Sequence, residues 1–162
     1  MRDRDLELRP FTAEDEPAII GVLEQAEVAR WWPTPDFERD TGWVVEVNGD
    51  LAGWVEYFEE ADRWYPSVAL DIALSSAIHG QGYGRRVLRM VIEHFAGKGH
   101  HRFTIDPNVA NERAIASYTA VGFHPVGVLR CYERNPAGGW NDALLMELIL
   151  ADVAERSGSG GL

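Results

Sequence analysis

Hydrophobic residues recur along the chain with two periods, and each change of period predicts a boundary between a strand and a helix. Alternating or continuous apolar runs between turn residues predict strands at 5–11, 43–47, 51–58, 68–74, 102–106, 123–133 and 143–150. Apolar residues three and four positions apart predict helices near residues 12–27, 85–96 and 111–121. The aromatic and proline-rich stretch 30–41 predicts a loop or a short helix.

Turn residues separate these elements and set their order. Asn48-Gly49 is a strong signal for a tight hairpin, and the last two strands flank a turn at 136–139. The resulting order is one strand and one helix, then three strands, then αβαββ, which predicts an α+β or mixed-sheet α/β domain. Residues 1–152 are expected to form this single domain, and the Gly/Ser-rich residues 153–162 a flexible tail.

The composition suits one soluble globular domain. The chain has 162 residues, of which 46% are hydrophobic and 25% are charged. No apolar run is long enough for a transmembrane helix, and the first residues carry no secretory apolar region. Cys131 is the only cysteine, which excludes an intrachain disulfide, and the five histidines lack metal-ligand spacing. These features predict a cytoplasmic protein with no bound metal and no membrane partner.

Net charge divides the chain into two unlike halves. Residues 1–76 carry 18 acidic and 6 basic side chains, a net charge of −12, whereas residues 77–162 carry 8 and 9, a net charge of +1. The acidic half would repel phosphates, which argues against a nucleic-acid partner. It suits either a cationic ligand or a solvated acidic face that aids solubility.

A glycine-rich stretch, His79-Gly80-Gln81-Gly82-Tyr83-Gly84, lies between the fourth predicted strand and the following helix. Its spacing differs from the phosphate-binding loop of ATPases and from the dinucleotide fingerprint. It is either a tight turn that needs glycine dihedral angles or a cradle whose backbone N–H groups bind an anion. Arg85 and Arg86 in the first helical turn oppose the helix dipole, which favours the anion.

A second motif lies about thirty residues downstream of the glycine stretch, and the two motifs together are specific for one family. Asn111-Glu-Arg-Ala-Ile-Ala-Ser-Tyr118-Thr-Ala-Val-Gly-Phe123, with the glycine stretch and the element order, resembles the GNAT superfamily of acetyl-CoA-dependent N-acetyltransferases over residues 5–150. Within it, Ala69–Leu74, Ile105–Asn111 and Trp31-Trp32 most resemble the aminoglycoside 6′-N-acetyltransferases and their siderophore-acylating relatives. The resemblance implies a mixed sheet of about seven strands flanked by about four helices, with splayed strands forming an acyl-CoA cleft.

The resemblance also implies that acetyl-CoA is the co-substrate. The edge of strand 68–74 would hold its pantetheine arm, the loop amides would hold its pyrophosphate, and Asn111 would fix the pantetheine, cap the next helix, or do both. The residues implied are Ile72, Ala73, Leu74, His79, Gly80, Gln81, Gly82, Tyr83, Gly84, Arg85 and Asn111. His79 departs from the Gln or Arg that is common in the superfamily.

Two aspartates, Asp71 and Asp106, stand in otherwise apolar strands, where a charge needs a partner or a function. Each could be a solvated residue or part of an ion pair, for example with Arg102. The resemblance implies that Asp71 is the general base for the amine and that Asp106 binds the amine or shares this role. It also implies that Tyr118 protonates the leaving thiolate, although Tyr118 also suits a core aromatic position. A backbone N–H near Ile72–Leu74 would stabilise the oxyanion.

The acceptor pocket is expected within residues 28–66, where aromatic residues alternate with acids. Ring faces and carboxylates suit an aminosugar or a polyamine, although the same alternation occurs in ordinary strands. The residues assigned to the substrate are Trp31, Trp32, Glu46, Asp71, Asp106 and Asp142. The acidic half would then face a cationic acceptor, while the CoA phosphates would face the arginines of the second half, namely Arg85, Arg86, Arg89 and Arg113.

Three functions fit these residues. The first is acetyl transfer to the 6′-amino group of an aminoglycoside. The second is the same chemistry on another amine, such as a siderophore hydroxylysine, a polyamine or a protein N-terminus. The third is a non-catalytic acyl-CoA-binding module, against which the joint presence of Asp71, Asp106 and Tyr118 argues. The partner expected is a small cationic amine, and the protein is expected to be a monomer or a homodimer.

Overall fold

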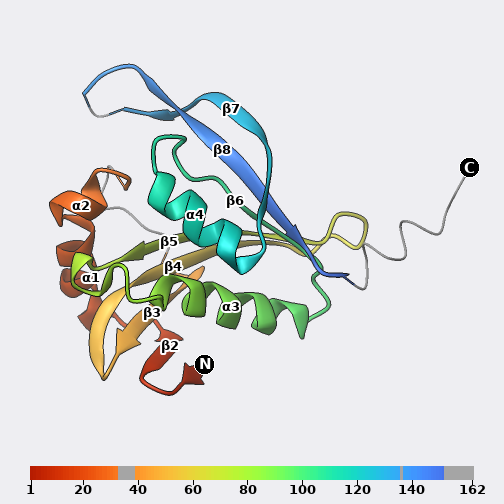
Figure 1. Ribbon diagram of the computed structural model, residues 1–162. Helices are drawn as coiled ribbons and strands as arrows, with labels where there is room; N and C mark the ends of the chain where they lie inside the picture. Colours follow the sequence, from red (N-terminus) through yellow and green to blue (C-terminus); the bar gives the residue numbers. More distant parts are fainter. Residues whose placement is uncertain (33–38, 136, 152–162) are drawn as a thin grey trace, which may run out of the picture.

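The computed structural model of the chain describes residues 1–32, 39–135 and 137–151. Within them, eight strands form one mixed sheet in the order β1-β2-β3-β4-β5-β6-β8-β7, and four α-helices pack beside it (Figure 1). The strands are β1 (Arg2–Asp3), β2 (Leu6–Pro10), β3 (Gly42–Val47), β4 (Asp50–Glu60), β5 (Ser67–Leu74), β6 (Arg102–Ile105), β7 (His124–Arg134) and β8 (Trp140–Ile149). The helices are α1 (Glu16–Leu23), α2 (Ala26–Ala29), α3 (Tyr83–Ala96) and α4 (Glu112–Val121). The mixed-sheet α/β fold predicted from the pattern is confirmed.

The helices cover both faces of the sheet, which explains why its central strands are apolar almost throughout. On one face, Phe95 of α3 shares a core with Val55 of β4 and Phe103 of β6. On the other face, Ile19 of α1 packs in a second core with Trp54 of β4. Successive residues of β4 therefore enter opposite cores, and a polar residue in this strand has to be accommodated inside the protein.

The sheet opens between β5 and β6. These two strands are parallel, and only Val68 with Phe103 and Ala69 with Thr104 are paired. Beyond Ala69, β5 continues for five residues with its other edge still paired to β4. The edge of β5 from Leu70 to Leu74 is therefore left without a strand partner, and it borders the cleft described below.

A glycine holds β5 close to β4 at the end of this open edge. Gly53 pairs with Leu74, and a Cβ atom at Gly53 would lie only 2.4 Å from the carbonyl oxygen of Ala73. That separation is too short for any side chain, so glycine alone fits here. The close approach fixes the carboxyl end of β5, from which the glycine loop begins.

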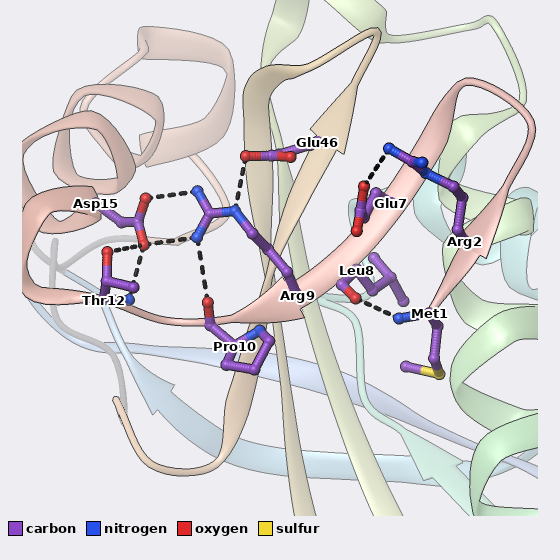
Figure 2. Close-up of polar contacts among 9 residues, drawn as sticks. All are labelled: Met1, Arg2, Glu7, Leu8, Arg9, Pro10, Thr12, Asp15 and Glu46. Carbon is purple, nitrogen blue, oxygen red and sulfur yellow. Dashed lines mark hydrogen bonds and ion pairs between the residues drawn. The ribbon is translucent and has the colours of Figure 1, made fainter.

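A partly buried ion-pair network joins β2 to the start of α1 and to β3 (Figure 2). The guanidinium of Arg9 donates two hydrogen bonds to Asp15, at 2.7 and 2.8 Å, and its Nε lies 2.7 Å from Oε1 of Glu46. The backbone N–H and the hydroxyl of Thr12 also donate to Asp15, which is only 8% exposed. Each charge in this network has a partner, as a buried charge requires.

Three boundaries differ from the sequence prediction. The first predicted helix is two helices, because the chain breaks at Glu24 and Gln25, where Gln25 adopts an extended ψ of 129°. An additional short strand, β1, pairs with β2 through Arg2 and Asp3, and the ammonium group of Met1 donates to the carbonyl of Leu8 (Figure 2). The last strand begins at Trp140 instead of Ala143. The predicted tail at 153–162 lies outside the described residues.

The network around Arg9 yields a stability prediction. Asp15→Asn is expected to lower the free energy of unfolding at pH 7 by about 2 kcal/mol, because Asn keeps an acceptor but loses the charge that pairs with Arg9. Hydrogen bonds from Arg9 hold the pKa of Asp15 well below its ordinary value, so this stabilisation is present above about pH 4 and is lost as the pH falls further. Urea unfolding followed by tryptophan fluorescence measures the effect. Asp50→Asn, at the exposed first residue of β4, is the control, and equal losses in both variants would contradict this explanation.

Candidate active site

A cleft of about 670 Å³ lies where β5 and β6 separate. Its walls come from α2, the exposed edge of β5, the glycine loop, α4 and β7. Most residues assigned from the sequence line it, namely Trp31, Trp32, Asp71, Ile72, Ala73, Leu74, His79, Gly80, Gly82, Tyr83, Gly84, Arg85, Asp106, Asn111 and Tyr118. One cavity therefore brings together the predicted co-substrate loop, the two aspartates and the tyrosine.

The glycine loop has the backbone of an anion cradle. Gly80 and Gly82 adopt φ values of 75° and 85°, which side-chain-bearing residues rarely adopt. Gly82 is the N-cap of α3, so the first N–H groups of this helix are directed at the cleft with the positive end of the helix dipole. The backbone of this loop therefore fits a phosphate group.

The two adjacent arginines of α3 have different partners. Arg85 lines the cleft. Arg86 instead points to the N-terminal segment, where it lies 3.0 Å from Asp3 and 2.9 Å from Asp5. The hydroxyl of Tyr83 also donates to Asp5 at 2.5 Å, and this bond together with Arg86 lowers the pKa of Asp5 to about 2. The expectation that Arg86 faces the co-substrate phosphates is therefore wrong.

His79 ties the loop to the end of β5. Its Nε2 lies 2.8 Å from the carbonyl oxygen of Leu74, so this nitrogen carries the proton and donates. The other ring nitrogen is buried without a hydrogen bond and lies 3.7 Å from Oε2 of Glu27 in α2. The imidazole thus has an anchoring contact at the position where the superfamily commonly has Gln or Arg.

Alternation along β5 determines which backbone groups face the cleft. The N–H of Ser75 donates to Ala52 of β4, so Asp71 and Ala73 also direct their N–H groups to β4. Ile72 and Leu74 therefore direct theirs to the open side. The N–H of Ile72 now donates to Oδ1 of Asp71 at 3.0 Å. The predicted oxyanion donor lies at the cleft, beside the predicted base.

Asp71 has an unusual electrostatic environment. Its side chain is exposed to the cleft, but the carboxylate lies among protein atoms and other acids. Burial, followed by the charges of Glu56 and Asp106, raises the pKa of Asp71 to about 7. The Ile72 N–H opposes this rise, and the charge of Glu133 adds the least to it. A carboxylate in this range gains and loses a proton near neutral pH, which is the property of a general base.

Tyr118 of α4 is buried at the base of the cleft, with 9% of its surface exposed. Burial and the charges of Asp71 and Asp106 raise its pKa well above the ordinary range. The phenol therefore stays protonated throughout the physiological range and has a proton to donate. Asn111 caps the same helix by accepting from the N–H of Ala114 at 3.2 Å and also lines the cleft, so the two roles considered for it are compatible.

Asp106 follows β6 and accepts a hydrogen bond from the hydroxyl of Tyr132 at 2.9 Å. Burial and this bond raise the pKa of Tyr132 to about 12. The suggested ion pair between an aspartate and Arg102 is wrong, because Arg102 lies 3.0 Å from Glu147 of the neighbouring strand β8. Asp106 therefore keeps a carboxylate oxygen at the cleft.

Three residues assigned from the sequence lie elsewhere. Glu46 of β3 is paired with Arg9, two strands away from β5. The side chain of Gln81 donates to the carbonyl of Ala77, within the loop itself. Asp142 of β8 accepts from the N–H of Cys131 in the irregular part of the β7–β8 ladder. None of the three is among the residues that line the cleft.

The structure adds residues that the sequence reasoning missed. These are Glu27 of α2 and Tyr132 and Glu133 of β7, which all line the cleft. Arg113 of α4, which the sequence already placed toward the co-substrate phosphates, lines it as well. Glu56 of β4 is buried directly opposite Asp71. For Glu56, the signal was present in the sequence, as an acid within an apolar strand, but its partner depends on the β4–β5 register.

Two further properties concern the described part of the chain. No group of three His, Cys, Asp or Glu side chains there is arranged to hold a metal ion. Among the helices of residues 1–32, 39–135 and 137–151, none combines the length and apolar character needed to cross a membrane.

Comparison with known proteins assigns the chain to a family. Residues 4–123 match the acetyltransferase (GNAT) family. The chain therefore belongs to this family of acetyl-CoA-dependent N-acetyltransferases, which confirms the family, the enzyme class and the acetyl-CoA co-substrate expected from the sequence.

Two sequence relatives extend this result. A Mycobacterium leprae protein of uncharacterised function is 31% identical over 158 residues, and the match covers 85% of this chain and 42% of that protein. The chain thus spans less than half the length of that relative. The N-alpha-acetyltransferase RimI of Mycobacterium tuberculosis is 28% identical over 145 residues, covering 76% of this chain and 89% of RimI.

Solved structures share the fold at lower identity. The aminoglycoside acetyltransferase AAC(6′)-Ib in complex with coenzyme A has a TM-score of 0.71 at 21% identity, covering 95% of this chain and 99% of that one. The spermidine N-acetyltransferase of Vibrio cholerae with CoA and spermine has a TM-score of 0.76 at 20% identity, covering 92% and 98%. These similarities concern the fold.

The different directions of the two arginines predict different effects on acetyl-CoA binding. Arg85→Gln is expected to raise the Kd for acetyl-CoA about tenfold, because it would remove the one charge-assisted contact that Arg85 is expected to make with a phosphate. Arg86→Gln makes the same change in charge at the next residue, away from the cleft, and should leave the Kd within about twofold. Isothermal titration calorimetry of both variants provides the measurement. A larger effect from Arg86→Gln would contradict the arrangement described.

Proposed function

We propose that the chain transfers an acetyl group directly from acetyl-CoA to a primary amine of a small cationic substrate, with the 6′-amino group of an aminoglycoside as the first candidate. The observation that carries the proposal is the single cleft that holds Asp71, Tyr118 and the glycine loop together. Asp71 acts as the general base, Tyr118 as the donor to the leaving sulfur, and Asp106 binds the substrate amine.

The residues of the cleft suit acetyl-CoA as the co-substrate. The open edge of β5 offers strand hydrogen bonds to the pantetheine arm, and the loop around Gly82 offers amides to the pyrophosphate. Arg85 and Arg113 add positive charge at the cleft for the phosphates. Acetyl-CoA supplies the activated acyl group as a thioester.

Asp71 has the proton affinity that amine activation needs. An ammonium group cannot attack until it loses a proton, and a base with a pKa near 7 accepts it more readily than an ordinary carboxylate. The N–H of Ile72 would stabilise negative charge on the thioester oxygen once Asp71 releases it. Tyr118, which remains protonated, would donate to the sulfur as the carbon–sulfur bond breaks.

The acceptor side of the cleft combines acids with aromatic rings. Glu27, Asp106 and Glu133 line it together with the rings of Trp31, Trp32, Phe58 and Tyr132. Arg30 already lies over the ring of Trp31, 4.6 Å from its centre, which supports the use of this ring face by a cation. Several carboxylates around one cavity favour a substrate with more than one ammonium group.

The main alternative acceptor is a protein N-terminus. It is favoured by the similarity to RimI, which is named an N-alpha-acetyltransferase. The aminoglycoside candidate is supported by the acidic and aromatic cleft wall and by the aspartate, asparagine and tryptophan motifs. A second structure of AAC(6′)-Ib, in complex with paromomycin and acetyl-CoA, shows that this fold accommodates such a substrate in another protein.

Substitutions at the two central residues test the chemistry. Asp71→Asn and Tyr118→Phe are each expected to lower kcat/KM at least a hundredfold, because each removes one proton transfer while leaving the cleft shape intact. The Kd for acetyl-CoA should stay within about threefold of the parent value. Release of CoA thiol measures turnover. If both variants acetylate at the parent rate, the assigned roles are wrong.

A panel of amines separates the acceptors. Kanamycin, spermidine, hydroxylysine and an alanine-initiated peptide are compared by CoA thiol release and mass spectrometry of the product. We expect the highest kcat/KM with kanamycin and a fall in that value with added salt, because the exposed cleft acids are screened. Preference for the peptide would select the alternative acceptor. Tight acetyl-CoA binding without turnover on any amine would favour a non-catalytic binding module.

A further inference from the structure

Glu56 is a buried acid that faces the proposed base from within the sheet. It lies on β4 directly opposite Asp71 of β5 in the antiparallel register, and only 5% of its surface is exposed. Residues directly opposite one another in an antiparallel pair project to the same face, with their Cβ atoms about 5 Å apart. The two acidic side chains therefore start from adjacent positions on one face of the sheet, and the charge of Glu56 acts on Asp71, although of the two only Asp71 lines the cleft.

One hydrogen bond to Glu56 favours its charged form. The indole N–H of Trp54, two residues earlier on the same strand and face, donates to Oε1 of Glu56 at 2.9 Å. A hydrogen bond to an ionised carboxylate stabilises that form. Trp54 is itself fully buried in the second core, so this donor is held in place by packing.

Two adjacent carboxylates in a partly buried site cannot both keep a full charge at low cost. Other groups add to the effect at Asp71. Asp106 after β6 and Glu133 of β7 are further negative charges, Tyr118 of α4 and Tyr132 of β7 are neutral hydroxyls, and the Ile72 N–H opposes them. The cations lining the described cleft, Arg85 and Arg113, come from the helices that flank its co-substrate side.

We propose that Glu56 and Asp71 act as a carboxylate pair that holds a single proton, in which buried Glu56 keeps the charge and Asp71 exchanges the proton with the acceptor ammonium. This inference rests on the proposed function, because it explains how Asp71 serves as a base. Glu56 is a positioning residue, since it has no surface in the cleft from which to touch the substrate.

The proton balance of the step is simple. An N–H bond of the ammonium breaks, an O–H bond forms at Asp71, and the nitrogen keeps the electron pair with which it attacks the thioester carbonyl. After the attack the nitrogen loses a second proton, which replaces the one that Tyr118 gives to the sulfur as the carbon–sulfur bond breaks. Before the next cycle, Asp71 returns its proton to solvent through the open cleft. Glu56 gains no proton during the cycle, and its charge makes Asp71 hold the proton more strongly than an isolated aspartate would.

The pH profile of turnover tests the pair. In the parent protein, kcat/KM for kanamycin or, if preferred, spermidine should fall below about pH 7, where Asp71 becomes protonated. In Glu56→Gln, which keeps an oxygen acceptor for Trp54, this acidic limb should move to lower pH by about one unit. Glu56→Asp keeps the charge and should keep the limb near its parent position. Glu60→Gln, an exposed acid on the same strand four residues away, is the matched control and should not move it.

A second measurement works without turnover and without any change at Glu56. Carbon-13 NMR of aspartate-labelled protein should show one carboxyl group that titrates near pH 7 and is absent from Asp71→Asn. If Asp71 titrates near pH 4 in the parent protein, or if Glu56→Gln leaves its titration unchanged, the pair is refuted. If Glu56→Gln moves the NMR titration but not the kcat/KM profile, the coupling stands, and the proposed role of Asp71 as the base fails instead.

Discussion

The separation of β5 from β6 after two paired residues is the constraint on which the site depends. A sheet strand with one edge paired and the other open presents backbone groups that can serve a ligand without disturbing the fold. Here β4 supports β5 along its whole length, and the close approach at Gly53 holds its end. The positions of the proposed base Asp71 and of the proposed oxyanion donor, the Ile72 N–H, depend on the direction of this single strand, and the glycine loop follows its end.

The charged residues are grouped by their position in the fold and not by their position along the sequence. Many acids of the first half are used in structural pairs, including Asp15 and Glu46 with Arg9. The acids of the cleft come from both halves, since Asp106 and Glu133 belong to the second. Acids and arginines line a single cavity, so opposite charges are available for an ammonium and for phosphates. The difference in net charge between the two halves of the sequence therefore does not predict which acids line the cleft.

Local signals made much of the fold and cleft predictable. The positive φ values of Gly80 and Gly82 require glycine, and Asn111 is a helix cap by residue type, so both could be placed from sequence. The directions in which two neighbouring side chains point could not be predicted in this way. Arg85 and Arg86 have the same charge on the same helical turn, and only the positions of Asp3 and Asp5 distinguish them. Glu56 was missed because its partner depends on the register between β4 and β5, which the sequence of the 61–66 connection does not specify. Glu46 was wrongly assigned to the acceptor pocket, because it lies on β3, two strands and about 10 Å from β5.

The most direct test of the central claim is a crystal structure with a non-hydrolysable thioether analogue of acetyl-CoA. The account predicts the pyrophosphate at the amides around Gly82, the sulfur within hydrogen-bond reach of the Tyr118 hydroxyl, and the acyl oxygen at the Ile72 N–H, with the Asp71 carboxylate turned away from that N–H. An analogue bound outside the β5–β6 opening, or with its acyl group remote from both Asp71 and Tyr118, would contradict it.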